Sequence, residues 1–143
     1  MMKKYELLAE DCLSAGDRTV YRIRALRDFG DVRHGDLGGY IESEDNLCHA
    51  GDAWVYDAAQ VYGPFAVVRD NGRVRGCAWV MGRVEDDAIV DDLAIVTEGA
   101  RVGGREILLY DEIAKARPSA RTLRPARAEI LAAVAMRGVR QVL

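Results

Sequence analysis

The residue types that most often do chemistry are few in this chain. Its 143 residues contain two histidines, His34 and His49, and three cysteines, Cys12, Cys48 and Cys77. The cysteines are far apart and lack the close spacing of zinc ligands. We therefore expect free thiols in a reducing cytosol, with Cys77 filling the core, and we expect no metal and no cofactor.

Acidic residues are the other candidates for chemistry. Glu85, Asp86, Asp87, Asp91 and Asp92 lie within eight positions. A calcium ion needs several oxygen ligands that converge on one point. Whether these carboxylates converge depends on the backbone that carries them, so the elements must be worked out first.

Length and composition indicate one globular domain of ordinary size. Half of the residues are apolar and the formal net charge is −3. Residues 1–100 are acidic overall, whereas residues 101–143 hold nine Lys/Arg against four Asp/Glu. No run of about 18 apolar residues suggests a membrane span, and the first residues lack the apolar stretch of a signal peptide. We expect a cytoplasmic protein of a bacterial cell.

A small residue followed two positions later by valine recurs nine times. Most steps between successive valines are six residues, with one step of seven and one of four. Neither the helical period of 3.6 nor the strand period of 2 gives a spacing of six. The pairs are Ala53/Val55, Ala59/Val61, Ala66/Val68, Gly72/Val74, Ala78/Val80, Gly82/Val84, Ala88/Val90, Ala94/Val96 and Ala100/Val102.

This spacing predicts a coil with three short strands per turn, each turn about 18 residues long. Valine points inward and packs on the valine of the next turn, while Gly or Asp two positions later forms the corner. The pattern V-x-[GD]-x-A-x over residues 53–102 resembles the hexapeptide repeat of left-handed parallel β-helices. The left-handed sense is what that resemblance implies.

The flanking segments predict a cap and a helical tail. Residues 19–26 alternate as a strand does, and Gly35, Gly38 and Gly39 indicate a turn into the first coil. The segment before the repeats resembles the leading part of small phage and prophage hexapeptide-repeat proteins. After residue 104 the spacing favours a helix over residues 106–116 and a second one after Thr122.

The predicted fold is mainly β: a left-handed parallel β-helix with an N-terminal β cap and C-terminal α-helices. We divide a single domain, residues 1–143, into three segments. Residues 1–50 form the cap and lead-in coil, residues 51–104 the hexapeptide-repeat β-helix, and residues 105–143 the C-terminal helices.

The residues on either side of each valine point outward, which gives the prism three faces. We call them the first, second and third face, in chain order. Their expected residues are Trp54, Tyr56, Arg73, Arg75, Ile89 and Asp91 on the first, Gln60, Tyr62, Trp79, Met81, Ile95 and Thr97 on the second, and Val67, Arg69, Arg83, Glu85, Arg101 and Gly103 on the third.

Two of these faces could be binding surfaces. On the first face, Trp54, Tyr56, Arg73 and Arg75 are candidates for partner binding, with an intramolecular cation–π ladder as the alternative. On the second face, Tyr62, Trp79, Met81 and Ile95 form an apolar stripe, and such stripes are interfaces when exposed. This stripe is either an oligomer contact or covered by the chain's own tail, including Leu109, Ile113, Ile130 and Val134. Together the faces favour a homo-oligomer, either a dimer or a trimer.

The acidic corners do not favour a metal. Asp86 is expected to stack over Asp70, and Asp92 two coils from Asp57, so the acids lie on separate corners. A solvated corner is favoured over a calcium site. The basic tail could bind nucleic acid, but docking on the acidic coil explains it equally well.

The resemblance implies two enzyme classes, acyltransferases and a class of carbonic anhydrase. The latter requires three histidine ligands, and this chain has only His34 and His49. An acyltransferase uses a base, usually histidine, beside a groove between subunits. Neither histidine lies within the repeats, and no long substrate loop interrupts the coils.

These observations favour a non-catalytic, phage-type protein-binding module. It would act as an oligomer and could antagonise host machinery such as a CRISPR-type defence complex. A hexapeptide-repeat acyltransferase and nucleic-acid binding through the C-terminal helices remain the alternatives.

Overall fold

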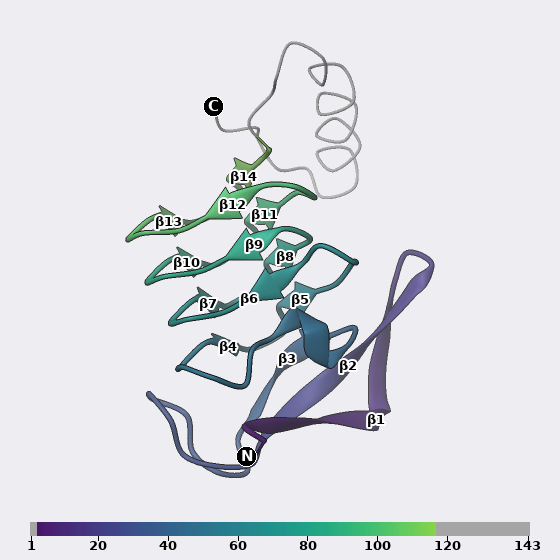
Figure 1. Ribbon diagram of the computed structural model, residues 1–143. Helices are drawn as coiled ribbons and strands as arrows, with labels where there is room; N and C mark the ends of the chain where they lie inside the picture. Colours follow the sequence, from purple (N-terminus) through teal and green to yellow (C-terminus); the bar gives the residue numbers. More distant parts are fainter. Residues whose placement is uncertain (1–2, 117–143) are drawn as a thin grey trace.

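The computed structural model describes residues 3–116, which form a coil of short strands with a longer hairpin at its N-terminal end (Figure 1). Stacked turns give the coil its elongated shape. The elements are β1 (Tyr5–Ala15), β2 (Arg18–Ala25), β3 (Leu37–Ile41), the 3-10 turn η1 (Glu44–Asn46), β4 (Trp54–Val55), β5 (Gln60–Val61), β6 (Val67–Val68), β7 (Arg73–Val74), β8 (Trp79–Val80), β9 (Arg83–Val84), β10 (Ile89–Val90), β11 (Ile95–Val96), β12 (Arg101–Val102), β13 (Ile107–Leu108) and β14 (Ile113–Ala114).

Three parallel sheets run along the coil, one for each face of the prism. The first face holds β4, β7, β10 and β13, the second holds β5, β8, β11 and β14, and the third holds β6, β9 and β12. Register partners in successive turns are 16 to 19 residues apart, as in Trp54, Arg73, Ile89 and Ile107. The β-solenoid and the division of outward residues among three faces are thus confirmed.

The core is a stack of inward-pointing valines with alanines beside them. Val55, Val74 and Val90 are all fully buried, and each occupies the same register position in its own turn. Ala59 and Ala78 are equally inaccessible to solvent. Because every coil covers its neighbour, the apolar interior continues from one turn to the next without a gap in register.

The corners adopt the left-handed backbone conformation that the sequence pattern predicts. Asp57, Asp70, Asp86 and Asp92 have φ between 55° and 57°. Each of these carboxylates accepts a backbone N–H from the turn above: Asp70 Oδ2 accepts from Asp86, and Asp86 Oδ2 from Gly104. A short polar side chain both tolerates this conformation and bonds the next corner.

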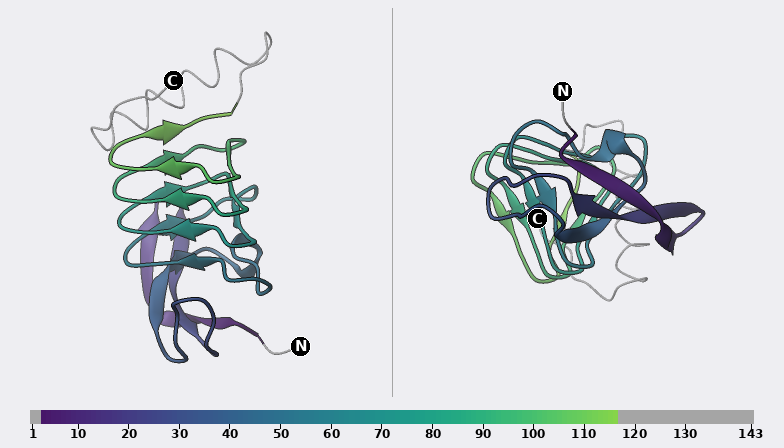
Figure 2. Two further views of the ribbon diagram at one scale, coloured as in Figure 1. Left: turned by 90° about the vertical axis from the view of Figure 1, so that its left-hand side faces the viewer. Right: turned by 90° about the horizontal axis from the view of Figure 1, so that it is seen from below.

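The N-terminal segment closes the lower end of the coil, as predicted. Seen from below, β1 crosses the end of the prism (Figure 2, right). β1 and β2 pair in antiparallel fashion, and β2 also pairs with β3. β3 then joins β5 in parallel, so the hairpin continues the second-face sheet. The strand expected over residues 19–26 is confirmed as β2.

Two expectations about glycines and cysteines are wrong. Gly38 and Gly39 do not turn the chain but lie within β3, where a Cβ at either position would come within 2.6 Å of a backbone oxygen of the coil. Gly35, with φ of 93°, does occupy a turn. Cys77 is exposed at a corner and is not a core residue, and none of the three cysteines, all within residues 3–116, forms a disulfide.

The helix expected over residues 106–116 is also wrong. The chain continues as solenoid there, with β13 paired to β10 and β14 paired to β11. Leu109 and Ile113 therefore belong to the coil and not to a covering tail. Tyr110 takes the corner position with φ of 57°, where the earlier turns have Asp or Gly. The second helix expected after Thr122 lies outside the described residues.

Among residues 3–116, no helix is long and apolar enough to cross a membrane.

Candidate functional site

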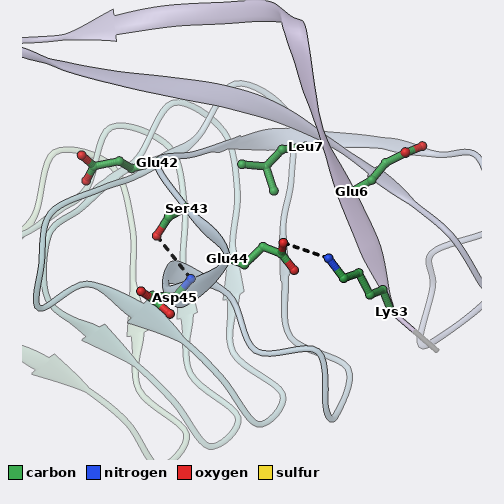
Figure 3. A pocket seen from close by; sticks show the side chains of 7 residues that line it. All are labelled: Lys3, Glu6, Leu7, Glu42, Ser43, Glu44 and Asp45. Carbon is green, nitrogen blue, oxygen red and sulfur yellow. Dashed lines mark hydrogen bonds and ion pairs between the residues drawn. The ribbon is translucent and has the colours of Figure 1, made fainter. Parts of the chain in front are cut away.

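An open cavity of about 610 Å³ lies where β1 passes the turn η1. It combines a hollow with several ionisable side chains, and Figure 3 shows it from close by. The residues around it come from the start of β1 and from the segment that follows β3. They are Lys3, Glu6, Leu7, Glu42, Ser43, Glu44 and Asp45.

The cavity carries negative charge, most of it held by ion pairs. Glu42 pairs with Arg18 at 2.8 Å and also accepts the backbone N–H of Gly63. Glu44 accepts a hydrogen bond from Lys3 Nζ at 3.0 Å. Hydrogen bonds from Lys3 and His49 keep the pKa of the Glu44 carboxyl below its usual range. Glu6 pairs with Arg24, so three of the four carboxylates around the cavity have a cationic partner.

The turn η1 is fixed to the coil by Asn46. Its side-chain oxygen accepts the backbone N–H groups of Glu42 and Ser43, and its amide donates to Gly63 and Ala66. The side-chain oxygen thus accepts two hydrogen bonds and the side-chain NH2 group donates two, which is why this polar residue can be buried. Sequence analysis missed Asn46, although Ser43 three positions earlier completes a capping box with it.

His49 lies behind the cavity and has no nitrogen left for catalysis. Nδ1 accepts the backbone N–H of Lys4 at 3.1 Å, and Nε2 lies 2.7 Å from Glu44 Oε1. The ring stacks on Tyr5 with centroids 4.2 Å apart. An Nδ1 that accepts requires Nε2 to donate, so the neutral ring cannot take a proton from a substrate without breaking these contacts.

His34 occupies a different setting. It is exposed in the loop between β2 and β3, where its backbone N–H donates to Asp28. Its ring is therefore open to solvent, unlike that of His49. Of the two histidines, His34 is the more accessible one.

The residues expected to bind a partner on the first face share that face but are not all accessible. Trp54 is 1% exposed, with Phe29 packed edge-on against it at 5.2 Å between centroids. Tyr56 donates to Asp31 at 2.7 Å, and Asp31 lies in the N-terminal cap. The cap therefore covers the lower part of this face. Trp54 is a core residue in this arrangement and cannot meet a partner.

The arginines of the first face are placed outward, as expected. Arg73 follows Trp54 in register, one turn higher. Arg75 pairs with Asp91 of the following turn at 3.1 Å. The ring contacts described for arginine lie elsewhere, with Arg22 over Tyr40 and Arg27 over Phe29. The partner surface on this face stays a prediction, now without its tryptophan.

The second-face stripe forms as the sequence predicts. Trp79, Met81 and Ile95 lie together, and Ile113 of β14 extends the stripe by one turn. Ile95 and Ile113 are 0% and 1% exposed. Tyr62 lies in the turn below and is half-buried. The stripe is therefore contiguous, and Ile113 is a member that sequence analysis had placed in the covering tail.

The third face contains a buried carboxylate that the sequence pattern does not reveal. Glu85 is 6% exposed, and its carboxylate lies 2.6 Å from Arg101 Nε, 3.5 Å from Arg69 Nε and 3.6 Å from Arg83 Nε. Gly103 leaves room for the Arg101 guanidinium to fold over it. Sequence analysis predicted a solvated mixed-charge face. The strand register predicts that these charges share one face. The packing of the Arg101 guanidinium against Gly103 is seen only in the structure.

The carboxylates at the acidic corners accept hydrogen bonds from backbone groups of the neighbouring turns. Asp86 lies over Asp70, as predicted, and Asp57 and Asp92 occupy another corner. In residues 3–116 no three His, Cys, Asp or Glu side chains converge as metal ligands would. The carboxylates instead accept N–H groups from successive turns.

Comparison with known proteins finds a similarity to a protein named an acetyltransferase. No family model matches the chain. The chain is 34% identical over 76 residues to a protein of Escherichia coli strain K12 named uncharacterized acetyltransferase YdcK. The match covers 52% of this chain and 23% of the relative, so the chain spans about a quarter of the relative's length.

This finding corrects the function favoured by sequence analysis. We expected a non-catalytic, phage-type module that binds host proteins, and the relative is instead named as an enzyme that transfers acetyl groups. The similarity supports the alternative of an acyltransferase. The chain is thus a β-solenoid repeat protein similar to a protein named an acetyltransferase.

Proposed function

We propose that this chain is the β-helix part of an acyltransferase of the hexapeptide-repeat kind. The observation that carries the proposal is the 34% identity to a protein named an acetyltransferase. The β-solenoid supports it, because its six-residue repeat resembles that of hexapeptide-repeat enzymes. The proposal includes the left-handed winding of the class and assembly into a homo-oligomer. Substrate grooves in that class lie between subunits.

The proposed reaction moves an acyl group from a coenzyme A thioester to a nucleophilic acceptor. The acceptor's amine or hydroxyl attacks the thioester carbonyl, the new bond to nitrogen or oxygen forms, and the carbon–sulfur bond breaks. The acceptor's proton passes to a base, which returns it to the departing sulfur, so coenzyme A leaves as the thiol. No redox step is required.

We assign His34 as the candidate base. It is the histidine whose ring is open to solvent, whereas both ring nitrogens of His49 are bonded. His49 is assigned a structural role, because it joins the start of β1 to the turn η1 through Lys4 and Glu44. Substitution of the two histidines should therefore affect turnover and stability differently.

The test is acetyl transfer from acetyl-coenzyme A to a panel of amines and alcohols. The coenzyme A that is released is measured by chromatography, because the protein's own cysteine thiols would react with a thiol reagent. We expect the His34→Ala variant to lose about 100-fold or more in turnover while it keeps its melting temperature. His49→Ala should lower the melting temperature and leave turnover per folded molecule within a few-fold.

Coenzyme A binding, measured by calorimetry, and molecular mass in solution complete the test. An oligomer that binds coenzyme A supports the proposal even before an acceptor is found. Failure to bind coenzyme A at millimolar concentration, with no acetyl transfer to any acceptor, contradicts it. Transfer that survives His34→Ala would overturn the assignment of the base alone.

A further inference from the structure

The second face contains outward positions that are buried. In the last turn, Ile107 and Ile113 hold equivalent places, since each is the first residue of a two-residue strand and precedes an inward-facing one. Ile107 on the first face is 56% exposed, whereas Ile113 on the second face is 1% exposed. Ile95, one turn below Ile113, is 0% exposed. On the third face, the neighbouring arginine side chains still leave the outward Glu85 6% exposed, so the deeper burial of Ile95 and Ile113 indicates that further side chains lie over the second face.

Among residues 3–116, the partly buried apolar side chains that pack against Ile95 and Ile113 are Trp79 and Met81, which belong to the same stripe and do not form a layer above it. The N-terminal hairpin joins the second-face sheet through β3, which pairs with β5 at the lower end of the coil. The cover therefore comes from residues beyond 116 or from another molecule.

The sequence beyond residue 116 has the charge and composition that this face requires. Residues 117–143 hold six arginines and one glutamate, whereas residues 1–116 hold 14 basic and 22 acidic residues. The segment also carries apolar side chains, among them Leu123, Ile130, Leu131 and Val134. A basic, apolar segment complements an acidic coil with an apolar stripe.

The path of the chain favours the same molecule over a second one. β14, which contains Ile113, ends at Ala114, two residues before the described part ends at residue 116. The 27 remaining residues thus begin beside the covered stripe. Docking a segment that is already tethered there costs far less entropy than recruiting a second molecule.

We propose that residues 117–143 dock on the second face of their own chain, over Trp79, Ile95 and Ile113. This face is then internal, and an oligomer must form through another surface. The inference does not depend on acyl transfer, because it concerns how the coil is covered and not what it binds.

The test compares two full-length variants, Ile113→Asp and Ile107→Asp, by limited trypsin digestion with mass spectrometry. Both place a carboxylate at the same register position of the last turn, but only position 113 lies under the proposed cover. We expect Ile113→Asp to speed cleavage at Arg121, Arg127, Arg137 and Arg140, which no proline follows, by about tenfold or more relative to the unmodified protein. Ile107→Asp should leave that rate within about twofold.

Two further measurements keep the result decisive. The milder Ile113→Thr variant replaces Ile113→Asp if the latter does not fold, with the same direction expected. Acrylamide quenching reports on Trp79, because Trp54 is 1% exposed, and quenching should rise in the position-113 variants. Equal cleavage and quenching in all variants would overturn the proposal. Protection of the segment that weakens on dilution, together with a dimer mass, would show that a second copy provides the cover.

Discussion

At the scale of single residues, the molecule buries polar groups only where the fold supplies partners for them. The clearest case is Lys4, which is fully buried at the lower end of the coil. Its Nζ donates to the carbonyl oxygen of Ala53 at 2.7 Å and to that of Gly51 at 3.3 Å, and it lies 4.9 Å from the centre of the Phe29 ring. Lys4 thus ties β1 to the lead-in of the first coil.

Burial lowers the pKa of Lys4 from 10.5 to about 8. Between these two values the unfolded chain binds a proton that the folded chain has released, so the free energy of unfolding rises with pH. We expect the unmodified protein to gain about 2 kcal/mol relative to Lys4→Met between pH 7 and pH 9.5. Urea unfolding of both proteins across this range measures the difference.

Tyr5 and Tyr56 do not disturb this comparison. Burial raises the pKa of both phenols, so their effect opposes that of Lys4 only above pH 10, and both proteins share it. A pH-independent difference between the two proteins would show that Lys4 is not held in a desolvated site.

At the scale of elements, the sequence predicts what repeats and misses what occurs once. Valine at each inward position and Asp or Gly at most corners fix the three sheets, and the register follows from counting. The first strand of the hairpin, β1, was not predicted, because its residues show no repeat and individual side-chain contacts hold the hairpin in place. Arg22, for example, bonds Asp11, the carbonyl of Gly38 and the Tyr40 hydroxyl.

The same distinction applies to the candidate site. His34 and His49 are visible in the sequence, but the engagement of both His49 nitrogens depends on where β1 crosses the coil. The helix predicted over residues 106–116 failed because Leu109 and Ile113 are four residues apart, which suits a helix. The hexapeptide step from Val102 to Leu108 and then to Ala114 was the stronger signal, although Leu and Ala replace valine.

β3 offers a direct test of how tightly the cap meets the coil. A Cβ on Gly38 would lie 2.6 Å from the Val55 carbonyl oxygen, 2.7 Å from Ile23 Cγ1 and 2.8 Å from the Trp54 ring. We expect Gly38→Ala to lower the free energy of unfolding by about 2–3 kcal/mol, because backbone and core must shift.

Gly16→Ala in the β1–β2 turn is the matched control. Its Cβ would meet no atom within 4 Å, and only its φ of 65° opposes the substitution, at a cost of about 1 kcal/mol. Chemical denaturation of both variants measures the two losses. A Gly38→Ala variant no less stable than Gly16→Ala would mean that the cap is loosely seated.

At the scale of the whole molecule, the two ends of the coil differ: one is closed by the cap, and the other, within residues 3–116, ends in edge strands. The N-terminal cap covers the lower end, while β12 and β13 terminate their sheets at the upper end. In a strand that has a further turn above it, the backbone N–H of the outward residue donates to a carbonyl oxygen of that turn. Ile89 N–H, for example, donates to the Glu106 carbonyl oxygen at 3.0 Å. Edge strands hold fewer such bonds, so local stability should fall toward the last turn.

Hydrogen exchange tests this gradient. We expect the amide of Ile107 in β13 to exchange at least about tenfold faster than that of Ile89 in β10, since both are outward residues of the same sheet. Mass spectrometry of peptides that cover each strand provides the measurement. Uniform protection from β7 to β13 would mean that the last turn is as firmly held as the interior.

The unequal lengths of the turns have a consequence for how such a chain can change. The step from Val61 to Val68 holds one residue more than six, and Phe65 on that corner is 62% exposed, yet β6 and β9 still pair without a register shift. Additional residues there project into solvent while the stacked interior stays undisturbed. The corner between Gly63 and Ala66 is therefore where a substrate-contacting excursion could be acquired, or a peptide engineered in, without redesign of the scaffold.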